Sequence, residues 1–435
     1  MHFSKLLSKI KNKKSVIGIV GLGYVGLPLV REYSRKKFKV IGIDIDKKKV
    51  DYLKKGKSYI KSIANSEVRE FLKNNFEATH RNEIIKKCDV VIYCLPTPLD
   101  KNKGPDMSYI DNTLKASSKF FKKGQLLILE STTYPGTTEE YFLPILNQRK
   151  FKVGKDIFLG YSPEREDPGN KQYSINQISK VVSGYSLKCK QLVKSLYQSV
   201  VKETVEVSSI KSAEMTKLLE NIYRCVNIGL VNELKLICEK MSMDIFDIVD
   251  AAKSKPFGFQ AFYPGPGLGG HCIPIDPYIL SWKAKEFGID TKFIELAGQI
   301  NESMPDYVIQ NLQDKLGQKN KTLHNSKVLI LGVAYKKNVD DIRESPALKI
   351  IELLEKKKVK ISYSDPFVKK LQKSRNYNFK YKSITLTKNK LMGFDAVILV
   401  TDHDLFNYKL ISKSSRIIID TRGRFKPDSK KIFRS

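Results

Sequence analysis

One glycine-rich segment carries a cysteine in a setting suited to nucleophilic chemistry. Around Cys272, the segment Tyr263–Asp276 (YPGPGLGGHCIPID) contains four glycines and three prolines. This composition restricts the backbone and leaves little side chain between the main chain and a ligand. An exposed thiolate here would be a nucleophile, whereas a buried cysteine would be a small apolar side chain. The residues alone leave both interpretations of Cys272 open.

A second segment has the glycine spacing of a dinucleotide-binding site. The apolar run Val16–Val20 is followed by Gly21, Gly23 and Gly26 and then by a helix-compatible sequence. The first glycine permits a tight turn, the second lets the backbone approach a pyrophosphate, and the third lets the helix pack on the strand. The phosphates would lie at the helix N-terminus, where free N–H groups favour anions. The pattern predicts a Rossmann-type site.

The next predicted strand ends in Asp44, which bears on the choice of cofactor. Its carboxylate can accept a hydrogen bond from the ribose 2′-hydroxyl of NAD, and it would repel the additional phosphate of NADP. We therefore predict NAD as the cofactor, although lysines at positions 47–49 weaken the repulsion of NADP. The predicted cofactor-binding residues of this region are Gly21, Gly23, Tyr24, Val25, Gly26, Asp44 and Lys49.

A lysine and an asparagine form a third candidate group. Lys217 and Asn221 are four residues apart on a predicted helix, so they share one face of it. A cation and an amide directed at one point can stabilise an oxyanion. From the residues alone, a solvated lysine and a helix-surface asparagine are the favoured interpretation of the pair. By itself it decides nothing.

The elements that must position these residues begin with an alternation of short apolar runs and helix-like segments. This pattern extends from Val16 to about Val207 and is typical of βαβ units in a mostly parallel sheet. The predicted strands are Val16–Val20, Val40–Ile43, Val90–Leu95, Leu126–Glu130, Ile157–Tyr161 and Lys180–Ser183.

The rest of the chain is first helical and then returns to the strand-rich pattern. A helical period starts near Ala213 and runs with few breakers to Lys253. A Gly/Pro-rich loop, Pro256–Pro277, precedes a second helical stretch from Thr291. The later strands are predicted at Val328–Leu331, Lys360–Tyr363, Ala396–Val400 and Ile417–Ile419. We expect an α/β protein with two doubly wound Rossmann-like domains, 1–207 and 321–435, joined by a central helical domain, 208–320.

The ordered motifs of the chain resemble those of the nucleotide-sugar dehydrogenases, the UDP-glucose and UDP-N-acetylhexosamine 6-dehydrogenases. The resemblance extends from Val16 to about Gly423. The motifs are GLGYVGLP at 21–28, PTP at 96–98, ESTTYPGTT at 130–138, SPERxxPG at 162–169, AEMTKLLEN at 213–221, PGPGLGGHC at 264–272 and YKKNVDDIRESP at 335–346.

The resemblance implies a two-step oxidation with a covalent stage. NAD takes a hydride from C6 of the sugar, the cysteine adds to the aldehyde as a thiohemiacetal, and a second hydride transfer gives a thioester that water hydrolyses. Cys272 matches the nucleophile, and Lys217 and Asn221 match the oxyanion-stabilising positions. Asp276 matches the carboxylate near the cysteine. Thr132 and Glu164 match groups proposed to handle water and protons.

The same resemblance implies further ligand contacts. Thr97 and Thr132 match the nicotinamide side, and Arg343 lies at a position linked to the ligands at the domain interface. The implied substrate-binding residues are Arg165, Glu166, Lys217, Asn221, Arg224, Lys255, Tyr263, Gly269, Lys336 and Lys337. The last domain lacks the second glycine of GxGxxG after Gly332. It is therefore expected to bind the UDP portion of the substrate, with a structural lid or subunit contact as the alternative.

Two departures from the UDP-glucose branch resemble the N-acetylhexosamine branch. Ile275 stands where that branch has a lysine, and the run Pro163–Gly169 is shorter than its acidic segment. The resemblance is greatest to the UDP-N-acetylglucosamine 6-dehydrogenases of surface-polysaccharide synthesis (O-antigen lipopolysaccharide or capsule). UDP-N-acetylmannosamine and UDP-glucose are the alternative substrates. An inactive nucleotide-binding scaffold is the alternative from a different class.

The net charge of +32 raises the question of a nucleic-acid partner. The 78 basic residues comprise 65 lysines and 13 arginines, spread over the whole chain. A surface that binds phosphates or bases usually enriches arginine for its bidentate fork. We therefore expect a solvated lysine-rich surface and no nucleic-acid partner. The positive charge would still help to attract an anionic substrate.

Cysteines, histidines and apolar runs bear on metal and compartment. The six cysteines and five histidines form no CxxC pair and no zinc-ligand spacing, so no metal is expected. No stretch approaches the ~18 to 20 uncharged apolar residues of a membrane span. We expect a cytoplasmic protein with reduced thiols. The predicted helix around Lys217–Lys240 carries enough apolar positions to bury a face in a homodimer or higher homo-oligomer.

Overall fold

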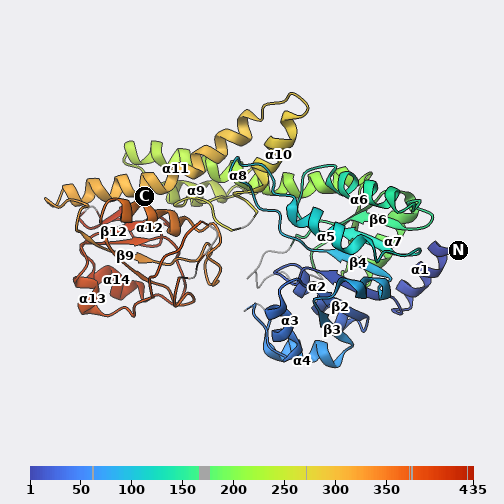
Figure 1. Cartoon of the computed structure of the whole chain (residues 1–435). Helices are drawn as coiled ribbons and strands as arrows, with labels where there is room; N and C mark the ends of the chain where they lie inside the picture. Colours follow the sequence, from blue (N-terminus) through green and yellow to red (C-terminus); the bar gives the residue numbers. More distant parts are fainter. Residues whose placement is uncertain (61–62, 166–176, 271, 372, 374–375, 429) are drawn as a thin grey trace. The chain divides into compact units, whose positions relative to one another are not determined.

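The computed structural model describes residues 1–60, 63–165, 177–270, 272–371, 373, 376–428 and 430–435 (Figure 1). The chain divides into two compact units. The N-terminal unit is Met1–Glu220 with Lys285–Phe287, and the C-terminal unit is Asn221–Ala284 with Gly288–Ser435. The predicted domain boundaries near residues 207 and 320 stay predictions.

The N-terminal unit is built on a sheet in the order β3-β2-β1-β4-β5-β6-β7-β8. Its strands are β1 (Val16–Val20), β2 (Lys39–Ile43), β3 (Phe76–Thr79), β4 (Val90–Tyr93), β5 (Leu126–Leu129), β6 (Phe158–Tyr161), β7 (Lys180–Gly184) and β8 (Thr204–Glu206). Strands β1 to β6 are parallel, in the dinucleotide-binding Rossmann order, and β7 is antiparallel to β6. The carboxyl ends of β1 and β4 therefore lie side by side at the point where the strand order reverses.

Helices cover both faces of this sheet because successive strand residues point to opposite sides. Ile92 of β4 lies in a core with Leu27 and Leu192. Its neighbour Tyr93 contacts Phe142 instead, at 5.5 Å between ring centroids. Figure 1 shows α1 beside α7, which pack together. The helices of this unit are α1 (His2–Lys11), α2 (Gly26–Arg35), α3 (Lys47–Lys54), α4 (Asn65–Lys73), the 3-10 helix η1 (Asn82–Lys87), α5 (Ser108–Ser118), α6 (Thr137–Gln148) and α7 (Leu187–Gln198).

The longest helix, α8 (Ile210–Lys240), begins in the N-terminal unit and continues into the C-terminal unit. It does not run on to Lys253 as the periodicity suggested. Ser242 has a φ of 57°, and the Asp244 side chain caps the next helix by accepting from Phe246 N. The other helices of this region are α9 (Ile245–Lys253), α10 (Asp276–Lys285) and α11 (Lys292–Gly317).

Helix α10 corrects the expected extent of the glycine-rich loop. The sequence pattern predicted a loop to Pro277 and no helix before Thr291, but α10 begins at Asp276. An acidic residue in the first turn interacts favourably with the helix dipole, and proline is tolerated there because its missing N–H needs no partner. The loop therefore ends at Ile275, directly before the helix.

The C-terminal unit contains a second parallel sheet in the order β10-β9-β11-β12-β13. Its strands are β9 (Lys327–Leu331), β10 (Lys360–Ser364), β11 (Ala396–Leu399), β12 (Ile418–Asp420) and β13 (Ile432–Arg434). The helices that cover it, besides α11, are α12 (Pro346–Lys356), α13 (Lys388–Met392) and α14 (Tyr408–Ser414). Ile330 lies in one core with Val308 of α11, and Leu331 lies in another with Leu391 of α13.

The expected fold class is confirmed: two Rossmann-like α/β domains with a long helix between them in the sequence. Within the part of the chain that the structure describes, no helix is long and apolar enough to cross a membrane.

Candidate active site

The glycine loop after β1 has the shape that a dinucleotide requires. Gly21 has a φ of +92°, and a Cβ on it would lie 2.2 Å from the carbonyl oxygen of Cys94. A Cβ on Gly26 would lie 1.9 Å from the carbonyl oxygen of Gly21. A Cβ on Gly23 would meet no atom within 4 Å, so this backbone faces open space. A pyrophosphate can approach there, at the N-terminus of α2, and the residues fit NAD.

Asp44, the residue expected to bind the ribose, also holds this loop. Its Oδ2 accepts a hydrogen bond from Leu22 N at 2.9 Å and from Lys49 Nζ at 3.4 Å. Its Oδ1 accepts from Asp46 N at 2.9 Å. An ionised carboxylate has about four acceptor positions, so capacity remains for a ribose hydroxyl. The Lys49 ammonium offsets part of the negative charge that would repel NADP.

The structure brings together Thr97 and Thr132, which follow β4 and β5. Thr97 is buried, and its Oγ1 donates a hydrogen bond to the carbonyl oxygen of Thr132 at 2.6 Å. Ser131 Oγ accepts from Leu95 N at 2.8 Å and ties the two strand ends together again. The predicted nicotinamide side therefore lies at the same edge of the sheet as the glycine loop. Of the other predicted cofactor residues here, Tyr24 is exposed and Val25 is half-buried.

Glu164 and Arg165 follow β6 and are already engaged within the unit. Glu164 Oε2 lies 3.2 Å from Lys180 Nζ. Arg165 donates to the carbonyl oxygen of Ser179 at 2.6 Å and pairs with Glu220 at 2.6 Å. An anionic substrate at Arg165 would compete with Glu220. Glu166, the other predicted substrate residue of this segment, lies outside the described residues.

Lys217 is buried in the part of α8 that belongs to the N-terminal unit. One turn earlier, Glu214 accepts from the backbone N–H groups of Gly136 at 2.5 Å and Thr138 at 2.9 Å, at the start of α6. Burial raises the pKa of Glu214 to about 7. This carboxylate anchors α8 to α6, so Lys217 stands on a helix held by hydrogen bonds. The buried position excludes the solvated lysine as an interpretation.

In the C-terminal unit, Asn221 and Asp276 form a buried pair. Asn221 Nδ2 donates to Asp276 Oδ2 at 2.5 Å, and both side chains are almost completely buried. The carbonyl oxygen of Cys272 accepts from the N–H groups of Ile275 at 3.0 Å and Asp276 at 2.8 Å. A single turn thus joins the cysteine to the start of α10. Asn221 is consequently not a helix-surface residue.

Exposure separates Cys272 from the other five cysteines. Cys272 is partly exposed, whereas Cys88, Cys94, Cys189, Cys225 and Cys238 are buried. Burial raises the pKa of Cys88 to about 12 and that of Cys225 to about 11, which keeps these thiols protonated. Among the interpretations left open by the sequence, a buried structural cysteine is therefore wrong for position 272.

The cysteine loop is held by buried polar groups that the sequence did not point out. Gly265 N donates to Asn232 Oδ1 at 2.9 Å, and the Gly265 carbonyl oxygen lies 3.4 Å from Lys235 Nζ. The Lys235 ammonium lies 4.9 Å from the ring centre of Tyr307. Burial lowers the pKa of Lys235 to about 7. The sequence could have pointed to Lys235, because a charged residue on a helix face predicted to be buried is unusual.

The other end of the loop packs on the segment that follows β9. A Cβ on Gly269 would lie 2.7 Å from Tyr335 Cβ, so only glycine fits. Gly270 N donates to the carbonyl oxygen of Arg343 at 3.0 Å. The Arg343 guanidinium is bound by Asp341, with Nη2 to Oδ2 at 2.6 Å. The cysteine loop and the predicted UDP-binding segment therefore belong to one compact unit.

A buried acid fixes the segment after β9 in the way that Asp44 fixes the loop after β1. Asp365 Oδ2 accepts from Val333 N at 2.7 Å and contacts His403 Nε2 at 3.0 Å. His403 Nδ1 accepts from Asn338 N at 2.9 Å, so its Nε2 carries the hydrogen. Although burial opposes it, the hydrogen bond from His403 holds the pKa of Asp365 below its usual range. No sequence motif pointed to this pair.

The remaining predicted substrate residues are dispersed over the C-terminal unit. Arg224 and Lys255 are exposed. Tyr263 is also exposed, and its hydroxyl donates to Asp250 at 2.5 Å. Lys336 is half-buried, and Lys337 pairs with Asp404 at 2.6 Å. Hydrogen bonds thus connect Cys272, Asp276 and Asn221. Within the described part of the chain, no hydrogen bond or ion pair connects Arg224 or Lys255 to these three residues.

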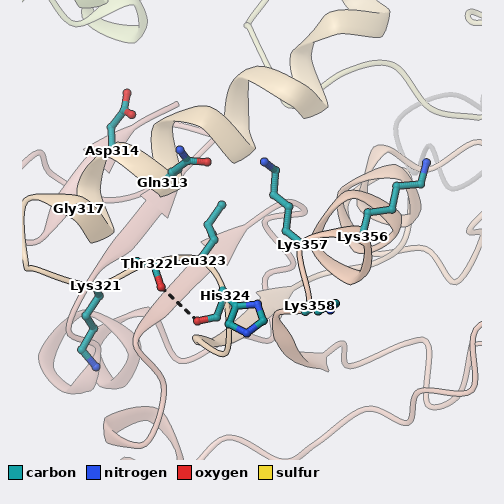
Figure 2. Close-up of a pocket in the computed structure, with 10 residues that line it drawn as sticks. All are labelled: Gln313, Asp314, Gly317, Lys321, Thr322, Leu323, His324, Lys356, Lys357 and Lys358. Carbon is teal, nitrogen blue, oxygen red and sulfur yellow. Dashed lines mark hydrogen bonds between the residues drawn. The ribbon is translucent and has the colours of Figure 1, made fainter.

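A hollow of about 710 Å³ elsewhere in the C-terminal unit contains none of the predicted site residues (Figure 2). It is lined mainly by residues 313–324 and 356–358, which precede β9 and β10. The cysteine loop contacts the segment that follows β9, at the carboxyl ends of the strands, where ligands bind in such folds. The hollow is therefore separate from the candidate site. Among the described residues, no group of three His, Cys, Asp or Glu side chains could hold a metal ion.

The fold and the loop geometry define a Rossmann-type dinucleotide-binding protein with a second α/β domain. The chain matches three parts of the UDP-glucose/GDP-mannose dehydrogenase family. These are the NAD binding domain over residues 15–201, the central domain over 211–303 and the UDP binding domain over 329–427. The chain belongs to this family. The predicted cofactor, NAD, is confirmed by the match to the NAD binding domain.

Individual relatives carry related names. The UDP-N-acetyl-D-glucosamine 6-dehydrogenase of Pseudomonas aeruginosa is 34% identical over 415 residues, covering 93% of this chain and 96% of the relative. The structure of the UDP-D-ManNAc dehydrogenase from Pyrococcus horikoshii has a TM-score of 0.87 at 33% identity, covering 96% of this chain and 98% of that one. The structure of the UDP-N-acetyl-mannosamine dehydrogenase from Staphylococcus aureus has a TM-score of 0.82 at 30% identity, covering 97% and 98%.

Proposed function

We propose that this chain oxidises the C6 alcohol of UDP-N-acetylglucosamine to the carboxylate in two NAD-dependent steps. The observation that carries this proposal is the position of Cys272. It is the one partly exposed cysteine, it lies in a loop where Gly269 leaves no room for a Cβ, and it is one turn from the Asn221–Asp276 pair. A four-electron oxidation needs a covalent acyl stage so that the reactive aldehyde is retained.

The proposed chemistry balances with two hydride transfers and one water. Bound NAD would supply the hydride acceptor for C6 in each of two rounds. The alcohol loses its hydroxyl proton in the first round. The Cys272 thiolate then forms a C–S bond to the aldehyde carbon, and the carbonyl oxygen takes up a proton to give the thiohemiacetal. The thiohemiacetal loses its hydroxyl proton in the second round and becomes a thioester. Water then attacks the thioester carbon, the C–S bond breaks, and Cys272 leaves as the thiolate.

The other residues receive roles by family resemblance and local chemistry. Lys217 and Asn221 would stabilise the developing oxyanion. Thr132 and Glu164 would handle water and protons, and Asp276 would orient Asn221 through their hydrogen bond. The proposed substrate contacts are Arg165, Glu166, Arg224, Lys255, Tyr263, Gly269, Lys336 and Lys337. Thr97 and Arg343 complete the proposed cofactor contacts.

The choice of sugar rests on Ile275 and the short Pro163–Gly169 segment, which resemble the N-acetylhexosamine branch. Relatives named for UDP-GlcNAc and UDP-ManNAc are equally similar to this chain, at 34% identity. UDP-N-acetylmannosamine is therefore the second candidate substrate, ahead of UDP-glucose. The product would supply surface-polysaccharide synthesis in the cytoplasm.

NADH counting tests the activity and the substrate together. We expect two NADH for each UDP-N-acetylglucosamine consumed, because the acyl stage retains the aldehyde until the second oxidation. UDP-N-acetylmannosamine and UDP-glucose should give lower kcat/KM values. One NADH per sugar, or none with any of the three, would contradict the two-step activity. A higher kcat/KM for UDP-N-acetylmannosamine, again with two NADH, would replace the substrate and keep the chemistry.

We also propose a homo-oligomer that buries one face of α8. Four exposed apolar residues of this helix, in the C-terminal unit, are spaced by seven, four and three positions: Tyr223, Leu230, Leu234 and Ile237. This is the spacing of an apolar seam between helices. Large exposed side chains in a row are typical of a protein contact.

The double substitution Leu230→Glu and Ile237→Glu should convert the assembly to a monomer, because two carboxylates would have to be desolvated at the contact. Light scattering after size exclusion measures the mass. Leu187→Glu is the matched control, since Leu187 is 69% exposed on α7, outside the apolar row. A wild-type monomer, or an unchanged assembly of the double variant, would contradict the proposed contact.

A further inference from the structure

A buried lysine joins Glu164 to a second carboxylate in the N-terminal unit. Lys180 begins β7, and its Nζ lies 3.1 Å from Glu130 Oε2 and 3.2 Å from Glu164 Oε2. Lys180 and Glu130 are almost completely buried. The hydroxyl of Tyr197, on α7, donates to Glu130. Buried charges persist only when they are paired and hydrogen-bonded, so these four side chains act as one cluster.

Glu164 is the member of this cluster that reaches solvent. Its side chain is 15% exposed, against 0% for Glu130 and 7% for Lys180. Its Oε1 accepts from Arg165 N at 2.7 Å, and its Oε2 contacts the Lys180 ammonium. The Arg165 guanidinium is taken up by Ser179 and Glu220. Lys180 therefore fixes the orientation of a carboxylate that remains accessible to water.

The protonation states of the cluster follow from its surroundings. The titratable groups around Lys180 and Glu164 are Glu130, Tyr33, Cys94, Tyr197 and Glu203, with Arg165 and Glu220 next to Glu164. Burial raises the pKa of Tyr33, Cys94 and Tyr197, so they stay neutral. Although burial opposes it, the two carboxylates raise the pKa of Lys180. Burial raises the pKa of Glu130 to about 7.

We propose that Lys180 is a positioning residue for thioester hydrolysis. Its ammonium holds Glu164 as an oriented carboxylate, and Glu130 supplies the buried counter-charge. This inference rests on the proposed function, in which Glu164 handles water and protons. Glu164 accepts a proton from the attacking water as the hydroxide forms its bond to the thioester carbon and Cys272 leaves as the thiolate. Above the pKa of Glu130, one ammonium and two carboxylates carry a net charge of −1, so the incoming proton brings the cluster to neutrality.

The two buried charges must shift the basicity of Glu164 in opposite directions. Removal of the Lys180 ammonium leaves two like charges, which favours protonation of Glu164. Removal of the Glu130 carboxylate leaves one matched ion pair, which disfavours it. If hydrolysis needs the Glu164 carboxylate, the acidic limb of the kcat profile moves to higher pH in Lys180→Met. The same limb moves to lower pH in Glu130→Gln. A merely structural role predicts no such opposition.

Burst kinetics with UDP-N-acetylglucosamine and NAD tests the step itself. Lys180→Met should lower kcat about 10²-fold, the lower end of general-base effects, with KM nearly unchanged. The hydride transfers precede hydrolysis, so each active site should still release two NADH in a rapid burst. Intact-protein mass should then show an acyl adduct on Cys272. Lys180→Arg should restore most of the turnover, because it keeps the positive charge.

Lys194→Met is the matched control, since Lys194 forms an exposed ion pair with Glu206 at 2.6 Å in the same unit. It should behave as wild type. The inference is overturned if Lys180→Met loses the burst and steady-state rates equally, or keeps wild-type turnover. If Lys180→Met does not fold, the pH profiles of Lys180→Arg and Glu130→Gln decide, and an unmoved acidic limb in Glu130→Gln overturns it. Each of these outcomes would overturn the role of Lys180 alone, because the wild type would still produce two NADH per sugar. If the proposed function is wrong, the wild type does not produce two NADH per sugar.

Discussion

Cys272→Ser should abolish formation of the UDP-uronate while binding of NAD persists. The hydroxyl is a much weaker nucleophile than the thiolate, so neither the acyl stage nor the second hydride transfer can follow. Loss of a nucleophile lowers kcat by factors on the order of 10⁴ or more. NADH release measured at saturating sugar, with NAD binding by fluorescence titration, checks both statements. The matched NAD binding domain, residues 15–201, lies in the other unit and does not include Cys272.

Cys238→Ala provides the matched control for this substitution. Cys238 is buried in a small apolar cluster with Ile245, Phe246 and Val249, so its loss costs packing and no chemistry. We expect lower thermal stability and an unchanged ratio of NADH to sugar. Full two-step oxidation by Cys272→Ala would refute the assignment of the nucleophile. Cys238→Ala, in contrast, should retain full two-step oxidation.

Asn221→Ala should lower kcat by about 10²- to 10³-fold, the usual cost of removing one oxyanion donor. The amide is buried and oriented by Asp276 at 2.5 Å, which is the preorganisation that such a donor needs. KM should change less than kcat, because the interaction strengthens as the oxyanion forms. Initial rates over a range of UDP-sugar concentrations separate the two constants.

Asn221→Ala also removes one hydrogen-bond donor from a buried carboxylate, which costs about 1–3 kcal/mol of stability. Rates must therefore be measured well below the unfolding temperature of the variant. Asn227→Ala is the control on the same helix, because its side chain donates to a backbone carbonyl oxygen, that of Tyr223. A kcat for Asn221→Ala equal to that of Asn227→Ala would rule out the proposed oxyanion role.

Strand positions could be predicted wherever a buried parallel strand is a continuous apolar run. Val16–Val20 matches β1 residue for residue, and Lys360–Tyr363 differs from β10 only at its end. The sequence did not predict β3, β8 or β13. These strands lie at the sheet edges, and β3 and β8 are short and partly exposed. Their extended form is stabilised by the neighbouring strand, which no local pattern reports.

The sequence predicted the central helical region, but it did not predict where the individual helices begin and end. The apolar period continues from α8 into α9, so periodicity alone joined them, whereas Ser242 and Asp244 separate them. The apolar pattern did not predict helix α10, because its apolar residues are spread around the helix instead of along one face. Its position matters for the site, since it places Asp276 at a helix N-terminus beside Cys272.

The sequence by itself determined the family, the cofactor and the candidate nucleophile, because these follow from long motifs and from glycines whose spacing has a steric cause. Only the tertiary structure decided that Cys272 is partly exposed and that Asn221 donates to Asp276, 55 positions away. It also decided that Lys180 links Glu130 and Glu164. The physical reason is common to all three. Burial and ion pairing depend on which distant segments fold against one another, and a single residue carries no record of its neighbours in space.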